Sequence, residues 1–396
     1  MRYTIGEMAE IIDGDRGKNY PQQHEFLDEG YCLFLNTGNV TKAGFSFDSN
    51  QFISKEKCDL LRKGKLQRHD IVYTTRGTVG NAAFYSDSIP YEHVRINSGM
   101  VIIRPKETIV CTEFLYQILK SDYYRPFFRK YCTGSAQPQL PIKNFSTIEL
   151  DLPDLPVQRF IAGILSSYDD LIENNQKQIK LLEEAAQRLY KEWFVDLRFP
   201  GHESTPIVDG VPEGWREQSL YQIADVVMGQ SPKSEYYNQV GEGLPFHQGV
   251  GSYGNRFVSD ETYSTSFTRI AEAGSILFSV RAPVGRLNLT KNKVVIGRGL
   301  AAINHRRGAQ SYLFYLLKEK FFRDDIIGNG SIFASISKEE LLNQKFLIPI
   351  DSLVGQFNGI AGGIDKKIDI LSEQIRLLTE ARNRLLPKLM SGEIEV

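Results

Sequence analysis

The stretch "IKLLEEAAQRL" at residues 179–189 returns almost unchanged as "IRLLTEARNRL" at residues 375–385. The two stretches share seven of eleven letters and lie 196 positions apart in a chain of 396 residues. At that offset, residues 168–194 and 364–390 match at ten positions. An internal repeat of this kind predicts that one structural unit has been used twice.

Both stretches carry apolar residues at heptad spacing over about four heptads, which is typical of a coiled coil. Because charged residues flank both apolar seams, we interpret them as two helices that pair with each other. The alternative, two separate amphipathic helices that each pack on their own domain, stays open. The predicted seam residues are Ile172, Ile179, Leu182 and Leu189 in the first helix and Ile368, Leu371, Ile375, Leu378 and Leu385 in the second.

Shorter similarities precede each helix. "DIVYTTRGTVG" (70–80) resembles "SILFSVRAPVG" (275–285), and "FLYQILK" (114–120) resembles "YLFYLLK" (312–318). Each copy therefore reads as a globular segment of strands and short helices followed by one long helix. We predict an α/β (α+β) fold with two similar globular domains separated by two long helices, which form an antiparallel coiled coil with pseudo-two-fold symmetry.

The repeat also suggests where the domains begin and end. A stretch rich in Pro, Gly and polar residues follows the first helix and is interpreted as a linker. The predicted segments are 1–150 and 213–350 for the two globular domains, 151–197 and 351–396 for the two helices, and 198–212 for the linker.

Composition indicates an ordinary globular protein, with 41% hydrophobic and 24% charged residues. The apolar runs fall well short of the ~18 residues that a membrane span needs, and the first residues lack the apolar region of a signal peptide. The four cysteines match neither a zinc site nor a redox pair, so a cytoplasmic location is expected. Charge is unevenly spread, because residues 151–212 hold 6 Lys+Arg against 11 Asp+Glu while both globular segments are mildly positive, which permits nucleic-acid binding.

The sequence shows no pattern for a catalytic centre. The glycine-rich "GVGSYG" (249–254) satisfies G-x-G-x-x-G, but neither a buried strand nor a helix start flanks it. A DNA-facing loop is therefore favoured there over a nucleotide site. We predict no catalytic residue, no metal site and no cofactor bound by this chain.

Polar and basic side chains gather in loops that differ between the two copies. Residues that discriminate bases should differ between copies, whereas Arg76 and Arg281, placed alike at strand ends, suit shared scaffolding or a salt bridge to a nearby acidic residue. The candidate DNA-binding residues are Arg16, Lys18, Asn36, Thr37, Asn39, Thr75, Arg76, Asn81, Gln137 and Gln139 in the first copy and Lys233, Tyr236, His247, Gln248, Tyr253, Arg256, Ser279, Arg281, Ser331 and Ser335 in the second.

Over essentially its whole length the chain resembles the specificity subunit of type I restriction–modification enzymes. The resemblance is carried by "LPDLPVQRFIAGIL" (152–165), "FPGHE" (199–203), "VPEGW" (211–215), "IPIDSLVGQFNGI" (348–360) and "LLPKLMSGEIEV" (385–396). The first copy departs from the pattern, because no lead like "VPEGW" precedes it.

The resemblance implies two target recognition domains that each read one half of a split, asymmetric DNA sequence. It implies that the two helices act as a ruler and dock two methyltransferase subunits, and that restriction subunits join the full complex. S-adenosylmethionine, ATP and Mg²⁺ are then expected on the partners. A helix of about 27 residues would be roughly 40 Å long, close to the ~34–36 Å of one DNA turn.

Two other functions remain open at this point. The first is a scaffold without DNA, in which the coiled coil gathers protein partners. The second is a self-sufficient enzyme that uses the glycine-rich loop. Sequence-preferring DNA binding would argue against the first, and failure to bind nucleotide or S-adenosylmethionine would dismiss the second.

Overall fold

The computed structural model describes residues 1–134, 137–321, 335–391 and 393–394. The chain forms two compact units, one comprising Met1–Asn175 with Glu373–Val396 and the other Gln176–Ser372. Two long helices, α6 (Leu155–Tyr190) and α11 (Asp351–Ser391), each contribute residues to both units. This division differs from the domain limits proposed from sequence, which remain a prediction.

Unit 1 contains eleven strands and five short helices among its described residues. The strands are β1 (Arg2–Thr4), β2 (Ala9–Asp13), β3 (Cys32–Leu35), β4 (Val40–Thr41), β5 (Gly44–Phe45), β6 (Phe52–Ile53), β7 (Ile71–Thr74), β8 (Ala82–Phe84), β9 (Val94–Ile96), β10 (Met100–Pro105) and β11 (Glu149–Asp151). The helices are α1 (Ile5–Met8), α2 (Lys55–Leu60), α3 (Thr112–Lys120), α4 (Arg125–Arg129) and α5 (Ile142–Ser146).

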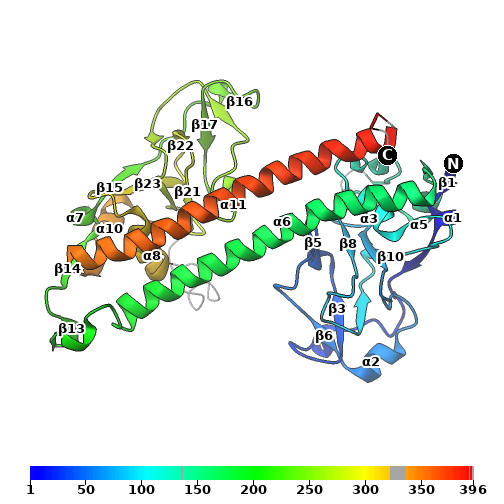
Figure 1. Ribbon diagram of the computed structural model, residues 1–396, viewed down its shortest axis with the longest axis horizontal. Helices are drawn as coiled ribbons and strands as arrows, with labels where there is room; N and C mark the ends of the chain where they lie inside the picture. Colours follow the sequence, from blue (N-terminus) through cyan, green and yellow to red (C-terminus); the bar gives the residue numbers. More distant parts are fainter. Residues whose placement is uncertain (135–136, 322–334, 392, 395–396) are drawn as a thin grey trace. The chain divides into compact units, whose positions relative to one another are not determined.

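Two sheets organise unit 1 (Figure 1). An antiparallel sheet has the order β2-β10-β7-β8, and a smaller sheet has the order β6-β3-β9, in which β3 and β9 run parallel. The core contains Tyr73 of β7 and Phe114 of α3, and it also takes in Ile161 of α6 and Leu389 of α11. Burying these four apolar side chains in one core attaches the helix pair to the sheets.

Unit 2 repeats this arrangement. Its strands are β12 (Ile207–Val208), β13 (Val211–Pro212), β14 (Arg216–Ser219), β15 (Ala224–Met228), β16 (Tyr237–Asn238), β17 (Leu244–His247), β18 (Tyr263–Ser264), β19 (Ile270–Ala271), β20 (Ile276–Ser279), β21 (Leu287–Leu289), β22 (Val294–Ile296), β23 (Leu300–His305) and β24 (Lys345–Ile348). Its short helices are α7 (Leu220–Ile223), α8 (Gln310–Phe321) and α10 (Lys338–Leu342).

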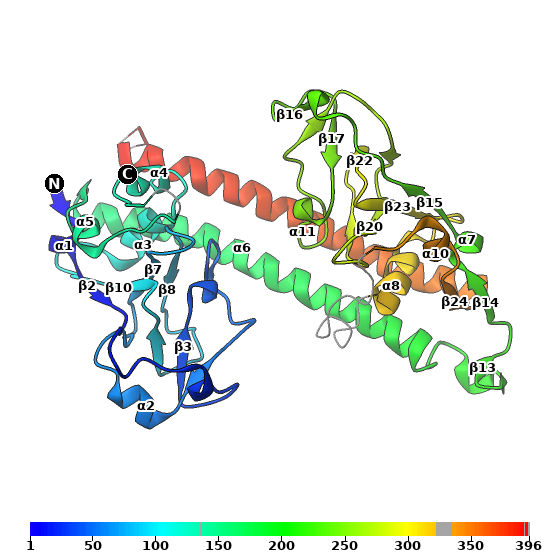
Figure 2. The same cartoon turned by 180° about the vertical axis from the view of Figure 1, so that it is seen from behind.

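The main sheet of unit 2 has the same strand order as the main sheet of unit 1, whereas its second sheet has five strands instead of three. Figure 2 shows the strands of unit 2. The main sheet is β15-β23-β20-β21, and the second is β16-β18-β17-β22-β19, with β17 parallel to β22. Two equivalents predicted from the repeat are present, because strand β7 corresponds to strand β20 and helix α3 corresponds to helix α8. The prediction of two similar α/β domains is confirmed.

The two long helices run antiparallel where they meet. In unit 1, Asp169 of α6 contacts Arg382 of α11 at 2.6 Å, and Asn175 donates to Gln374 at 3.3 Å, so one residue number rises as the other falls. In unit 2 the rings of Tyr190 and Phe357 lie 5.7 Å apart. These contacts confirm the antiparallel pairing.

The seam residues are turned inward on both helices. Every predicted seam residue is buried or half-buried. By contrast, four apolar residues outside the seam are about half exposed or more, namely Leu171, Leu181, Ile370 and Leu377. Although α6 and α11 are long, neither they nor any other described helix is apolar enough to span a membrane.

Candidate nucleic-acid interface

Each unit has one loop around which some of its polar candidates lie. Parallel strands end at the same edge of a sheet, so the segments after β3 and β9, and after β17 and β22, come together. We name Asn97–Gly99, between β9 and β10, hub loop 1, and Gly297–Gly299, between β22 and β23, hub loop 2. The backbone of each hub loop begins with the same bond, from Asn97 N to Leu35 O at 2.9 Å and from Gly297 N to His247 O at 2.8 Å.

Hub loop 1 gathers several predicted residues of unit 1. Arg16 donates through Nη2 to the Ser98 carbonyl at 3.3 Å, and the Arg76 amide donates to the Gly99 carbonyl at 3.1 Å. Thr37 packs against the same loop, since a Cβ added to Gly99 would lie 2.8 Å from Thr37 Cγ2. Around this loop the structure also brings together Asn36, which follows β3, and Gln139, which forms a β-bridge with Arg76.

Hub loop 2 gathers predicted residues of unit 2 in the same way. The Gly299 amide donates to the Gln248 carbonyl at 3.2 Å, and the Val280 amide donates to the Gly299 carbonyl at 2.9 Å. Arg281, next along the chain, forms a β-bridge with Ser335, as Arg76 does with Gln139. An open hollow of about 590 Å³ beside the loop is lined by Ser231, Pro232, Lys233, Ser234, Glu235, Tyr237, Gln248 and Arg298.

Several candidates are buried and bonded within the protein. His247 contacts Ser252 Oγ at 2.9 Å and Asp260 Oδ1 at 3.1 Å, and Ser279 donates to the Pro283 carbonyl at 2.6 Å. Asn39 donates to the Ser46 and Ser49 carbonyls. Burial and bonds within the protein favour a structural role for this group, which comprises Asn39, Thr75, Asn81, His247, Arg256 and Ser279.

Tyr253 also acts within the protein. Its hydroxyl donates to the Leu277 carbonyl at 2.9 Å, and burial raises the pKa of the phenol well above its usual value. The group therefore stays protonated and serves as a donor. Tyr253 directly follows the short 3₁₀ helix Val250–Ser252. The glycine-rich stretch is therefore held by two side-chain hydrogen bonds, one between His247 and Ser252 and one from Tyr253 to Leu277.

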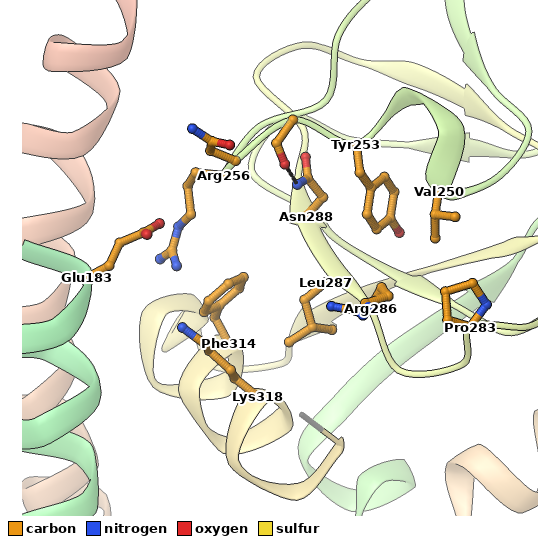
Figure 3. A pocket seen from close by; sticks show the side chains of 12 residues that line it. Glu183, Val250, Tyr253, Arg256, Pro283, Arg286, Leu287, Asn288, Phe314 and Lys318 are labelled. Carbon is orange, nitrogen blue, oxygen red and sulfur yellow. Dashed lines mark hydrogen bonds between the residues drawn. The ribbon is translucent and has the colours of Figure 1, made fainter. Parts of the chain in front are cut away.

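Arg256, another predicted DNA contact, is also held within the protein. It is 3% exposed, pairs with Asp365 of α11, and lies with its guanidinium 3.7 Å from the centre of the Phe314 ring. Figure 3 shows the side chain between Glu183 and Phe314. Burial raises the pKa of Glu183, against the opposing effect of Arg256 and Lys318.

The remaining candidates lie away from the hub loops or outside the described residues. Lys18 and Gln137 are exposed on loops, and Tyr236 is exposed at the end of the 3₁₀ helix Ser234–Tyr236. Ser331 falls outside the described residues. Within the described ranges, no group of three or more His, Cys, Asp or Glu side chains could hold a metal ion.

The geometry thus offers hydrogen-bond donors and positive charge at a sheet edge. The family described as "Type I restriction modification DNA specificity domain" matches residues 1–184 and 212–382. The chain belongs to this family.

Individual relatives agree with that assignment. The chain is 29% identical over 385 residues to the putative type I restriction enzyme MjaX specificity subunit of Methanocaldococcus jannaschii, covering 90% of this chain and 89% of the relative. It is 21% identical over 468 residues to the type I restriction enzyme HindI specificity subunit of Haemophilus influenzae, covering 98% and 100%. The crystal structure of the type I restriction–modification S subunit from M. genitalium has a similar fold, with a TM-score of 0.58 at 16% identity, covering 98% of this chain and 95% of that chain.

Sequence reasoning missed the centre of each cluster in this specificity-family chain. Hub loop 1 reads Asn-Ser-Gly and hub loop 2 reads Gly-Arg-Gly, at equivalent places between equivalent strands. A signal was present in the sequence, because "VRINSGMVII" (94–103) and "VVIGRGLAAI" (294–303) align, and Ser98 of the first stretch is replaced by Arg298 in the second. Their shared role emerged only when the parallel strands brought distant loops to the same edge.

Proposed function

We propose that the chain is the DNA sequence-specificity subunit of a type I restriction–modification complex and that it reads a bipartite, asymmetric target. The supporting observation is that one polar edge is built twice, around hub loops 1 and 2, with different side chains. Two similar scaffolds with different contact residues suit two half-sites of different sequence. The subunit itself is not a catalyst.

The proposal includes partners. A specificity subunit works with DNA, methyltransferase subunits and restriction subunits, and we infer that two methyltransferase subunits dock on α6 and α11. Leu181 and Leu377, equivalent at the 196-residue offset, are 64% and 50% exposed, which supports near-symmetric docking surfaces. S-adenosylmethionine, ATP and Mg²⁺ belong to the partners, and the complex acts in the cytoplasm.

Comparing methylated adenines in the host genome with and without this chain tests the proposal. A single split motif that disappears with the chain is the expected result. An unchanged methylation pattern, together with purified complexes that never prefer one duplex over random competitor, would favour the protein-scaffold alternative.

Domain exchange tests the division of labour. Replacing residues 213–350 with the equivalent segment of another family member should change one half-site and leave the other. Coordinated changes in both half-sites would contradict independent recognition domains.

The ruler role of the helices has its own test. Inserting whole turns into the 168–194 helix should change the required spacer, because each residue adds about 1.5 Å of rise. Altered half-site sequences with an unchanged spacer would refute that role.

A further inference from the structure

We propose that Arg298 of hub loop 2 is a specificity-determining residue that reads a guanine edge in the half-site recognised by residues 213–350. This inference rests on the proposed function and adds a base and a residue to it. Three observations support it. Arg298 occupies a position that differs between the two copies, its backbone is held by hydrogen bonds, and its guanidinium has no hydrogen-bond or ion-pair partner among the described residues.

The backbone of hub loop 2 is held from several directions. The Arg298 amide donates to Ser231 Oγ at 3.2 Å, and Ser231 Oγ donates to Gln248 Oε1 at 2.7 Å. The loop also bonds to the segment after β17, through Gly299 N and the Gln248 carbonyl, and to the segment after β20, through Val280 N and the Gly299 carbonyl. These hydrogen bonds fix the backbone position from which the Arg298 side chain extends.

The glycines on either side make this close packing possible. A Cβ at Gly297 would lie 2.6 Å from Gln248 Oε1, and a Cβ at Gly299 would lie 2.6 Å from the Gln248 carbonyl oxygen. Any side chain at either position would push hub loop 2 away from Gln248. The sequence Gly-Arg-Gly therefore presents a single long side chain from a tightly packed turn.

Among the described residues, the Arg298 side chain has no hydrogen-bond or ion-pair partner of its own. It is exposed, and its guanidinium makes no hydrogen bond or ion pair with any described residue. Glu235, the acidic residue lining the same hollow, is 3.7 Å from Lys233. A guanidinium free of internal partners keeps both arms of its fork for a bidentate contact, and the commonest such contact in DNA recognition is with guanine O6 and N7.

Comparison of the two copies indicates different roles for Arg298 and Arg281. Arg281 has an arginine counterpart, Arg76, so both units present that group and it suits a contact that every target offers, such as phosphate. Arg298 is replaced by Ser98 in unit 1, where the basic group comes instead from Arg16, already bonded to Asp13. A position that changes between two otherwise equivalent scaffolds is suited to sequence discrimination.

The experiment uses the chain assembled with its methyltransferase subunits. The motif methylated by the wild-type complex is mapped first, and duplexes carrying it, each with one base pair replaced, are then compared by methylation rate. For Arg298→Ala we expect discrimination at one G·C pair of one half-site to fall by roughly 10- to 100-fold, with the other half-site unaffected. Arg298→Lys should retain binding to random duplex but lose part of that discrimination, because lysine lacks the fork.

Controls distinguish the ways in which this inference could be wrong. Arg216→Ala removes another exposed arginine, on β14, and should leave the motif unchanged. A uniform loss across all duplexes, with the slope of log affinity against log salt reduced by about 0.9, would assign Arg298 to phosphate and overturn the inference. An unchanged motif in Arg298→Ala and in Arg298→Ser, with normal thermal unfolding, would also overturn it.

The same experiment separates this inference from the proposed function. If the wild-type complex itself shows no sequence preference, the proposed function fails and the inference falls with it. If the wild-type complex reads a motif that the Arg298 variants also read in full, only the inference fails.

Discussion

Asp169 and Asp365 occupy equivalent positions on the two long helices but are neutralised in different ways. In unit 1, Asp169 accepts from Gln117 at 2.6 Å, Lys120 at 2.8 Å and Arg382 at 2.6 Å. In unit 2, Asp365 pairs with Arg256, which comes from a loop of the globular part.

The difference follows from one position on the opposite helix. The equivalent of Arg382 is Ala186, which is fully buried and carries no charge. The Arg256 guanidinium lies over Phe314, just as the Lys120 ammonium lies over Tyr116, the equivalent ring, at 4.9 Å. The repeat has thus kept a half-buried carboxylate, a cation and an aromatic ring, while the segment that supplies the cation has changed.

Among the changes considered, removing Arg256 should cause the largest loss of stability. Arg256→Ala leaves the carboxylate of Asp365, on a helix, without its cation, so we expect a loss of about 3–5 kcal/mol in the free energy of unfolding of unit 2. Urea unfolding followed by tryptophan fluorescence measures it, because both tryptophans, Trp193 and Trp215, lie in the unit 2 core. Arg307→Ala, which breaks an exposed pair with Asp351, is the control and should cost less than about 1 kcal/mol. Equal effects of the two variants would contradict the assigned role.

The matching change in unit 1 is Asp169→Asn. Burial alone would raise the pKa of Asp169, but Lys120, Gln117 and Arg382 together lower it below its usual range. We expect a loss of about 2–3 kcal/mol at pH 7, since two cations lose their countercharge. Amide hydrogen exchange of α3 measures this loss.

The pH dependence gives a second readout for Asp169. A carboxyl whose pKa is lowered by folding stabilises the folded state above its unfolded pKa of about 3.9, and that stabilisation is lost as pH falls through the folded pKa. The difference between wild type and Asp169→Asn should therefore shrink in acid, as urea titrations at pH 7 and pH 3 can show. Asp170→Asn, at an exposed neighbour, is the control and should have no such effect.

A smaller change concerns the seam itself. Asn175 is 7% exposed and bonded to Gln374, whereas its equivalent in the second helix is Leu371, which is 2% exposed. Asn175→Leu should stabilise unit 1 by about 1 kcal/mol through apolar burial while weakening the specification of helix register. Thermal unfolding and light scattering measure stability and oligomeric state, with Asn174→Leu as an exposed control. A clear loss of stability would show that the hydrogen bond matters more than burial.

The smallest effect is expected for Glu183→Gln. Burial raises the pKa of Glu183, so its ionised form costs stability at neutral pH, and that cost disappears as pH falls below the unfolded pKa of about 4.3. The variant should be more stable than wild type by less than about 1 kcal/mol at pH 7 and equal to it in acid. This sign is opposite to that of Asp169→Asn, and tryptophan fluorescence with Glu184→Gln as the control can verify it. A destabilised Glu183→Gln at pH 7 would mean that the attraction to Arg256 exceeds the cost of burial.

Much of the architecture was predictable from the sequence because it is periodic. Heptad spacing in "IKLLEEAAQRL" and "IRLLTEARNRL" places Ile179 and Ile375 on apolar seams, and the polar linker leaves the helices free to pair antiparallel. The repeat then implies that the two globular parts share one fold. The spacing of apolar residues along the chain is therefore enough to predict which side of each long helix is buried.

The candidate site was predictable only in part. The sequence indicated the loops that bear Arg16, Gln248 and Arg281, since polar residues mark turns, but His247 and Arg256 appear as polar as these and are buried. Burial depends on which distant segments cover a side chain. A single loop sequence does not contain that information.

What the sequence alone determined is the repeat, the helix pair and the membership of the family, because these depend on spacing along the chain. Only the tertiary structure decided that Arg256 neutralises Asp365 and that Asn97–Gly99 and Gly297–Gly299 are the centres of the two polar clusters. Those roles arise where parallel strands end together and where a half-buried carboxylate requires a cation from whichever segment lies within reach.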